Sequence, residues 1–339
     1  MHFSHPRIKE GCEIRRESRG IILAYFGEDL SFEVDDPNQI ASIESLIRLL
    51  DGSRTIDEII AAPHGLDAVD VETALSLLDE NLLLTEGAEA SPGKHGLTFI
   101  TELEDFYYNV WMRADGETNL VKAIFDGTAE REVLLGWGLE SFHVTSRAHD
   151  CLSPMIARFH GAFKRKAIDY FLDEYRHDKL LMKSLLAAGF EREAIQRSLP
   201  LPYTHATMNL LAKWANTDLL SFMACLFVFE GTPEIGNAYI DSLAQYDLPA
   251  GFVKGQSVHN DINSDGDHGN ISRDFFAMID QVSTDDQARV VRNLRLLYET
   301  QRRKHDNVLQ YYLAPTIGIP RLLPDAGIAD PVGGVSYAA

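Results

Sequence analysis

The stretch FLDEYRHDKLL, residues 171–181, places a glutamate and a histidine among apolar residues that otherwise suit a buried helix. Glu174 and His177 are three residues apart, so on a helix both side chains lie on one face. Burying ionisable groups is costly unless a partner compensates their charge. The stretch therefore predicts a buried helix that carries metal ligands.

Three other segments present carboxylates in a similar setting. Glu140 and His143 lie in GWGLESFH, Glu230 ends the apolar run LLSFMACLFVFE, and Asp265 and His268 lie in HNDINSDGDHGN. Each carboxylate alone is explained by a place on the surface or at a helix end. Four helical segments that each present one toward an apolar side are typical of a carboxylate-bridged di-iron or di-manganese site in a bundle.

Composition and charge exclude several classes of protein. The chain has 339 residues, of which 45% are hydrophobic and 24% charged, as in an ordinary soluble protein large enough for two domains. No apolar run approaches the ~20 residues of a membrane span, and the first 20 residues lack the apolar core of a secretory signal. The three cysteines form neither a CxxC pair nor a disulfide framework. We expect a cytoplasmic protein without a membrane partner.

The net charge of -20 disfavours nucleic acid as a partner, because phosphate contacts need a basic surface. The basic clusters are short and lie within an acidic chain, at 7–19, 163–166 and 301–304. Each is expected to be a solvated helix face.

Periodicity divides the chain into two regions. Residues 20–36 predict two short strands with a turn near Gly27, and three helical segments follow, NQIASIESLIRLLDG, TIDEIIAA and DAVDVETALSLLDENLLL. Beyond a segment rich in Gly and Pro, apolar residues recur with a period of 3.6. The fold class is therefore mainly α, a helical bundle preceded by a small α+β winged-helix domain. The expected boundaries are 1–87 for the winged-helix module, 88–96 for a linker, 97–315 for the bundle and 316–339 for a tail.

The order and spacing of the carboxylates and histidines resemble the haem-oxygenase-like di-iron oxidase superfamily. This is the non-haem iron branch of the fold shared by haem oxygenase, TenA-like thiaminases and the pyrroloquinoline-quinone synthase PqqC. The resemblance covers about 97–315. It implies a haem-oxygenase-like bundle with two Fe(II) ions per chain and O2 as co-substrate, and it identifies no catalytic residues beyond the metal ligands. The ligands that it implies are Glu140, Glu174, His177, Glu230, Asp265 and His268, with Asp261 as a further candidate.

The last metal segment leaves alternatives open. Members of the superfamily sometimes have a third ligand one turn before the aspartate–histidine pair, where this chain has Asp261. His259, Asp267 and His143 are therefore further candidates. The same ligand types suit iron and manganese, so the sequence does not separate the two metals.

Residues 261–272, DINSDGDHGNIS, also resemble a calcium loop. Its twelfth position should be a bidentate glutamate and is Ser272 here. This alternative therefore predicts weak calcium binding only.

The front module has a resemblance of its own. LIRLLDGSRTIDEIIAA followed by VETALSLLDENLLL resembles the PqqD-like peptide-recognition domains of ribosomal-peptide maturation enzymes. Those winged helices bind a leader peptide by strand addition to a hairpin edge, which here would lie within 21–34. The resemblance implies a leader peptide or partner protein as ligand. The alternative is a vestigial or dimerising winged helix, and the acidity of residues 28–89 disfavours one that reads DNA.

Together the resemblances imply a non-haem di-iron O2-activating oxidase or oxygenase in natural-product biosynthesis. Its substrate would be derived from an amino acid or a peptide, and the reaction would be N-oxygenation, desaturation or oxidative C–C cleavage. The alternatives are a metal-free PqqC- or TenA-like enzyme and a non-enzymatic winged-helix adaptor or regulator. The sequence leaves the substrate and the oligomeric state open, with a homodimer as one option.

Overall fold

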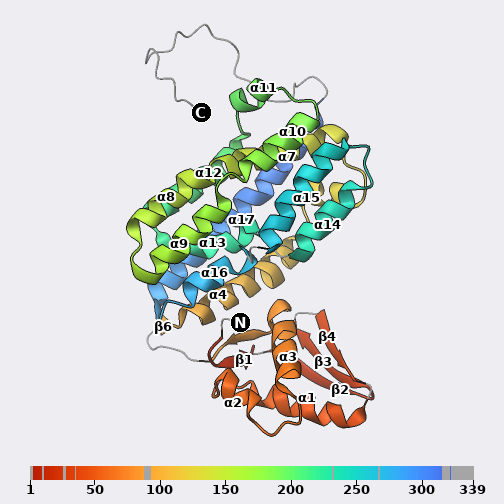
Figure 1. Ribbon diagram of the computed structural model, residues 1–339, viewed down its shortest axis with the longest axis vertical. Coiled ribbons are helices and arrows are strands. Elements are labelled where there is room, and N and C mark those ends of the chain that lie inside the picture. Colours follow the sequence, from red (N-terminus) through yellow and green to blue (C-terminus); the bar gives the residue numbers. More distant parts are fainter. Residues whose placement is uncertain are drawn as a thin grey trace.

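A small module of strands and helices lies beside a large bundle of helices (Figure 1). The computed structural model describes residues 3–9, 11–25, 28–34, 36–87, 93–230, 233–265, 268–314 and 321. Within these ranges the side chains of 37, 38, 233–235, 263–265 and 268 are not described. The turn at Gly27, residues 88–92 of the expected linker and, apart from Arg321, the expected tail lie outside the described residues. The mainly helical fold class with a small α+β region is confirmed.

The module is built on a three-stranded antiparallel sheet in the order β2-β3-β4. Its strands are β2 (Glu13–Glu17), β3 (Gly20–Tyr25) and β4 (Glu28–Glu33), and β1 (Pro6–Ile8) pairs separately with β5 (Leu84–Glu86). The predicted hairpin is thus present as β3 and β4, which pair antiparallel along their whole length. The helices are α1 (Pro37–Leu49), α2 (Ile56–Ile60) and α3 (Ala68–Glu80).

The module also corrects one expectation. The basic cluster at 7–19 is not a solvated helix face, because it contains the end of β1 and all of β2. Every residue of β2 is exposed, so the segment has no apolar face that could reveal it as a strand. It is held by backbone pairing with β3 and by ion pairs of Arg15 with Asp29 and Arg16 with Glu44.

The bundle begins with α4 (Gly96–Asp105), which continues directly into a π-helix, η1 (Phe106–Met112). Figure 1 shows α4 on the side of the bundle nearest the module. Covered from both sides, α4 has nine of its ten residues buried. The remaining elements are α5 (Arg113–Asp115), α6 (Asn119–Phe125), α7 (Arg131–Ser146), α8 (Ala148–Arg158), α9 (Gly161–Glu174), α10 (Asp178–Ala187), α11 (Arg192–Arg197), α12 (Pro202–Thr217), α13 (Leu219–Glu230), α14 (Pro233–Leu243), α15 (Ala250–Asp265), the 3-10 helix η2 (His268–Asn270), α16 (Ile271–Phe276) and α17 (Thr284–Tyr312), with β6 (Gly93–Lys94) paired to β7 (Val282–Ser283).

The most apolar helix, α13, lies inside the bundle, with seven consecutive residues from Ser221 to Phe227 buried. A helix that is hydrophobic on all sides belongs in the core of a protein or in a membrane. None of the helices in the described part of the chain is long and apolar enough to cross a membrane. The burial of α13 by α12, α16 and α17 accounts for its composition.

Buried charges join the module to the bundle on two sides of α4. Arg273 of α16 donates from Nε to Glu104 at 2.8 Å and also pairs with Asp79 of α3. These three charged groups come from both domains, and Arg273 is only 6% exposed. Since an unpaired buried charge is very costly, the pairing fixes the module against α4 and α16.

A second group of contacts surrounds Asp105, the last residue of α4. The hydroxyl of Tyr25 donates to its Oδ2 at 2.5 Å, and the Lys9 ammonium lies 3.7 Å from its Oδ1. Lys9 also donates to the Thr101 carbonyl at 3.1 Å. Burial lowers the pKa of Lys9 to about 8, although Asp105 opposes this shift. The start of the π-helix is therefore tied to the end of β3, next to the hairpin turn.

Candidate metal centre

The helix that carries Glu174 is interrupted at that residue. The sequence predicts one continuous helix through 171–181, but α9 ends at Glu174 and α10 begins at Asp178. Between them Arg176 has a φ of +79°, a left-handed conformation that non-glycine residues seldom adopt. The expectation of a shared helix face is therefore wrong. The break nevertheless leaves His177 Nδ1 3.3 Å from Glu174 Oε2, with both side chains largely buried.

Other candidate groups gather around this pair. The buried Tyr170, one turn before Glu174, donates its hydroxyl proton to Glu230 Oε1 on α13. The rings of His177 and His259, the latter on α15, have centroids 5.6 Å apart. Tyr170 thus links α9 to Glu230 of α13, and His177, in the break before α10, contacts both Glu174 and His259 of α15. Burial, followed by the charges of Glu230 and Glu174, raises the pKa of Tyr170 well above its usual value, so it remains a donor.

The donor set suits a divalent metal of borderline hardness, for which carboxylates and imidazoles are common ligands. Among the side chains that the structure describes, no three carboxylate, imidazole or thiol groups converge as closely as the ligands of one ion. The contacts are pairwise, and the described residues do not form a closed coordination sphere. The side chains of Asp265 and His268, which the sequence assigns to the same site, lie outside the description.

The segment expected to carry the last ligands is mostly helical. Asp265 is the final residue of α15, His268 begins η2, and Asp267 lies outside the described residues. Asp261 is exposed and lies two positions from His259, which places the two on nearly opposite faces of the helix. Asp261 also lies one turn before Asp265 on α15, so its assignment as a ligand stays a prediction. Because residues 261–265 are helical, they do not form the open loop of a calcium site.

Glu140 lies in a different polar cluster. Its carboxylate is fully buried and accepts hydrogen bonds from Leu201 N and the Tyr312 hydroxyl, each at 2.9 Å. Burial raises the pKa of Glu140, while these hydrogen bonds and the Lys304 ammonium act in the opposite direction. These partners belong to the N-cap of α12 and to α17. The structure therefore does not bring Glu140 into contact with Glu174, His177 or Glu230, and its assignment as a ligand stays a prediction.

Lys304 corrects the expectation for the basic cluster at 301–304. Its side chain is 7% exposed, so this residue does not belong to a solvated helix face. The ammonium lies 4.9 Å from the ring centroid of Trp137, a cation–π contact. Burial lowers the pKa of Lys304 to about 8, and Glu140 opposes this shift. No sequence signal within QRRK distinguishes Lys304 from its neighbours.

His143, the spare candidate ligand, is buried against α11. Its Nε2 lies 3.0 Å from the hydroxyl oxygen of Ser198. Burial, followed by the charge of Arg147, lowers the pKa of His143 to about 4, so the ring is neutral at pH 7. The hydrogen bond of His143 therefore does not involve the cluster of Glu174 and Glu230, and its partner Ser198 belongs to no sequence motif.

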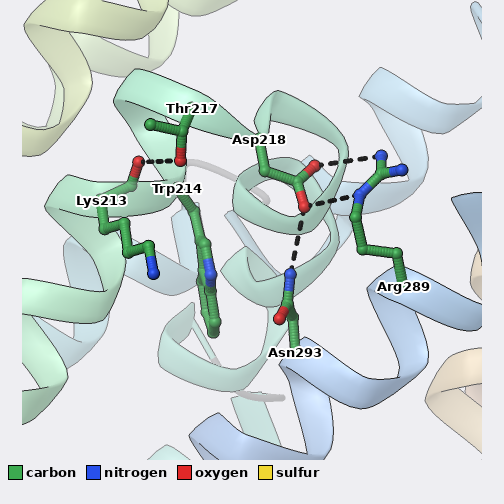
Figure 2. Close-up of a pocket in the computed structure, with 6 residues that line it drawn as sticks. All are labelled: Lys213, Trp214, Thr217, Asp218, Arg289 and Asn293. Carbon is green, nitrogen blue, oxygen red and sulfur yellow. Dashed lines mark hydrogen bonds and ion pairs between the residues drawn. The ribbon is translucent and has the colours of Figure 1, made fainter.

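A surface hollow of about 300 Å³ lies elsewhere, where α12 ends and α13 begins (Figure 2). Asp218 accepts hydrogen bonds there from Arg289 Nε at 2.9 Å and Asn293 Nδ2 at 3.1 Å. Burial alone would raise the pKa of Asp218, but the bonds from Arg289 and Ser221 hold it below its usual value. None of the candidate metal ligands lines this hollow, and its acidic group is already satisfied by the protein.

Comparison with known proteins supports the fold of the bundle. Residues 136–302 match the model of a family described as iron-containing redox enzymes. A domain of unknown function with a haem-oxygenase-like fold from Shewanella denitrificans is 17% identical, with a TM-score of 0.55 over 63% of this chain and 93% of that one. A TenA homologue from Pseudomonas syringae is 12% identical, with a TM-score of 0.54 over 66% and 98% of the two chains. Another from P. horikoshii is 16% identical, with a TM-score of 0.50 over 62% and 98%.

No curated protein matches the chain. The predicted haem-oxygenase-like fold of the bundle is confirmed, and its similarity to iron-containing redox enzymes covers α13 and all of the candidate ligands. The matched segment starts at residue 136, so the PqqD-like resemblance of the front module stays a prediction.

Proposed function

We propose that the protein is a non-haem di-iron oxidase or oxygenase that activates O2. Its substrate is derived from an amino acid or a peptide, in natural-product biosynthesis. The observation that carries the proposal is the cluster of Glu174, His177, Glu230 and His259, drawn from four helices. It lies in the part of the chain that matches iron-containing redox enzymes.

The residues around the cluster suit the retention of a metal. Glu174, His177, Glu230 and His259 are the described side chains that would hold iron, and Asp265 and His268 are the further ligands expected from the sequence. When bound, ferrous iron supplies the electrons that reduce O2. The apolar helix α13 carries Glu230 at its end, after seven consecutive buried residues. Carboxylates in such surroundings gain strongly from a nearby cation.

The proposal extends to the front module as a peptide-recognition domain. The strand order β2-β3-β4 leaves β2 and β4 at the edges of the sheet. An edge strand offers backbone N–H and C=O groups to another extended chain. Strand β4 lies in the segment expected from the sequence, so we assign peptide recognition to its edge.

The test is to load the protein with ferrous iron without oxygen, measure the retained metal, and then follow an O2 pulse by optical spectroscopy. We expect about two irons per chain, as the carboxylate ligand set of such bundles implies. A transient visible band should follow the pulse. Loading with Mn(II) in parallel compares the two metals. Absence of retained metal and of O2 uptake would contradict the proposal.

A second candidate is a metal-free enzyme of the TenA type. The observation in its favour is that two of the similar solved structures are TenA homologues. At 12% and 16% identity, this similarity concerns the fold alone. The metal measurement separates the two candidates, because only the first requires the carboxylates of the cluster to bind a cation.

A further inference from the structure

Tyr170 belongs to no sequence motif, yet it lies beside two of the candidate ligands, Glu174 and Glu230. It lies on α9 at the position i-4 to Glu174, so the two side chains project from the same face of that helix. Its hydroxyl reaches Glu230, 60 residues later in the chain, and donates to Oε1. The side chain is 5% exposed, and a buried tyrosine hydroxyl normally has such a partner.

The position of Glu230 explains why it needs this partner. Glu230 is the last residue of α13, and its side chain is only partly buried. A long side chain at a helix end has several rotamers available, and holding it in one of them costs conformational entropy. The hydrogen bond from the rigid, packed ring of Tyr170 restricts that freedom before any ligand binds.

We propose that Tyr170 is a positioning residue for the metal centre. Its hydrogen bond to Oε1 holds the Glu230 carboxylate toward α9, the helix that ends at Glu174. This inference rests on the proposed function, since it requires a metal to bind at the cluster. It assigns to Tyr170 the role that outer-shell partners of metal ligands perform, where loss typically weakens metal affinity by about 10–100-fold.

The test compares Tyr170→Phe with the wild-type full-length protein. Ferrous iron affinity is measured without oxygen by competition with a chromogenic chelator. We expect Tyr170→Phe to bind iron at least about 10-fold more weakly. Tyr239→Phe is the matched control, because the Tyr239 hydroxyl is also buried but has no hydrogen-bond partner among the described residues. It should leave the affinity unchanged.

Two further measurements separate positioning from a general loss of structure. Urea unfolding of the metal-free proteins shows whether Tyr170→Phe keeps the fold. If it does not, Tyr170→His, which retains a ring with an N–H donor, takes its place. Combining Tyr170→Phe with Glu230→Gln should weaken binding no further than Glu230→Gln alone, because both changes act on one carboxylate.

The outcomes distinguish the inference from the function on which it rests. If the wild type binds no iron, both are overturned. If the wild type binds iron and folded Tyr170→Phe binds it equally well, only the inference is overturned. Additive losses in the double variant would also overturn it, since Tyr170 would then act independently of Glu230.

Discussion

Two carboxylate sites of the bundle differ in how the protein compensates their charge. Glu140 has an ammonium from Lys304 and two hydrogen-bond donors within the protein. Glu174 and Glu230 instead have the imidazole of His177 and the hydroxyl of Tyr170 beside them. At Glu140 the protein itself supplies a cationic group and hydrogen-bond donors. Imidazoles are themselves metal ligands, so the arrangement at Glu174 and Glu230 is suited to receive a cation from solution.

The largest expected effect is loss of metal from the second site. Glu174→Ala and Glu230→Ala remove a carboxylate from the cluster, and we expect each to abolish iron retention after anaerobic loading. Metal content per chain is the measurement. Asp169→Ala is the control, because Asp169 is exposed on α9, is not among the candidate ligands and should leave retention unchanged. Full iron retention in Glu174→Ala would show that Glu174 does not hold the metal, and the proposed difference between the two carboxylate sites would be wrong.

The next effect concerns stability at the first site. Lys304→Met removes the buried ammonium whose charge opposes the effect of burial on Glu140, and we expect it to lower the free energy of unfolding by about 1–3 kcal/mol. Urea unfolding at pH 7 measures the change. Adding Glu140→Gln to the same protein removes the uncompensated charge and should restore most of the lost free energy of unfolding. Unchanged stability in Lys304→Met would show that Glu140 does not depend on this cation.

A smaller effect is expected from His143 as the pH falls. Its pKa is lowered to about 4 by burial, against an ordinary value of 6.5. The unfolded chain therefore binds the proton first, and this contribution to stability is full above pH 6.5 and is lost progressively toward pH 4. Between pH 6.5 and pH 5 the loss is about 2 kcal/mol.

Urea unfolding at these two pH values, for the wild type and for His143→Gln, isolates the contribution of this residue. The pH-dependent loss should be smaller in the variant by that amount. Equal losses in both proteins would mean that His143 is not buried in its neutral form beside Ser198.

The sequence predicted the features that depend on residues close together in the chain. The apolar periodicity located the helices of the bundle, and the predicted segment TIDEIIAA forms α2, which begins with a capping box of Thr55 and Glu58. The break at Arg176 escaped prediction because a left-handed residue inside an apolar, helix-forming stretch has no signature of its own. Burial of Lys304 escaped for a related reason, since its partner Glu140 comes from a distant helix.

Other contacts between residues far apart in the sequence also could not be predicted. Arg273 meets Glu104 and Asp79 at separations of 169 and 194 residues. Nothing in either local segment indicates that these charges are buried together. The candidate ligands could be predicted because a di-metal site requires several carboxylates, which form a pattern in the sequence. Tyr170 needs only one hydrogen-bond partner, so no sequence pattern indicates it.

The buried charges around α4 have a consequence for how the two halves of the chain work together. Lys9, Tyr25 and Asp79 of the module pair with residues of the bundle, so separating the two halves would leave charged groups on both without these partners. The module is thus not carried on a flexible tether. A peptide held at its hairpin would start from a fixed position relative to the bundle. The distance between the hairpin and the reaction site would then be fixed. This distance would set the number of residues between the recognised segment and the reacting one, whereas a flexible linker would act only through effective concentration.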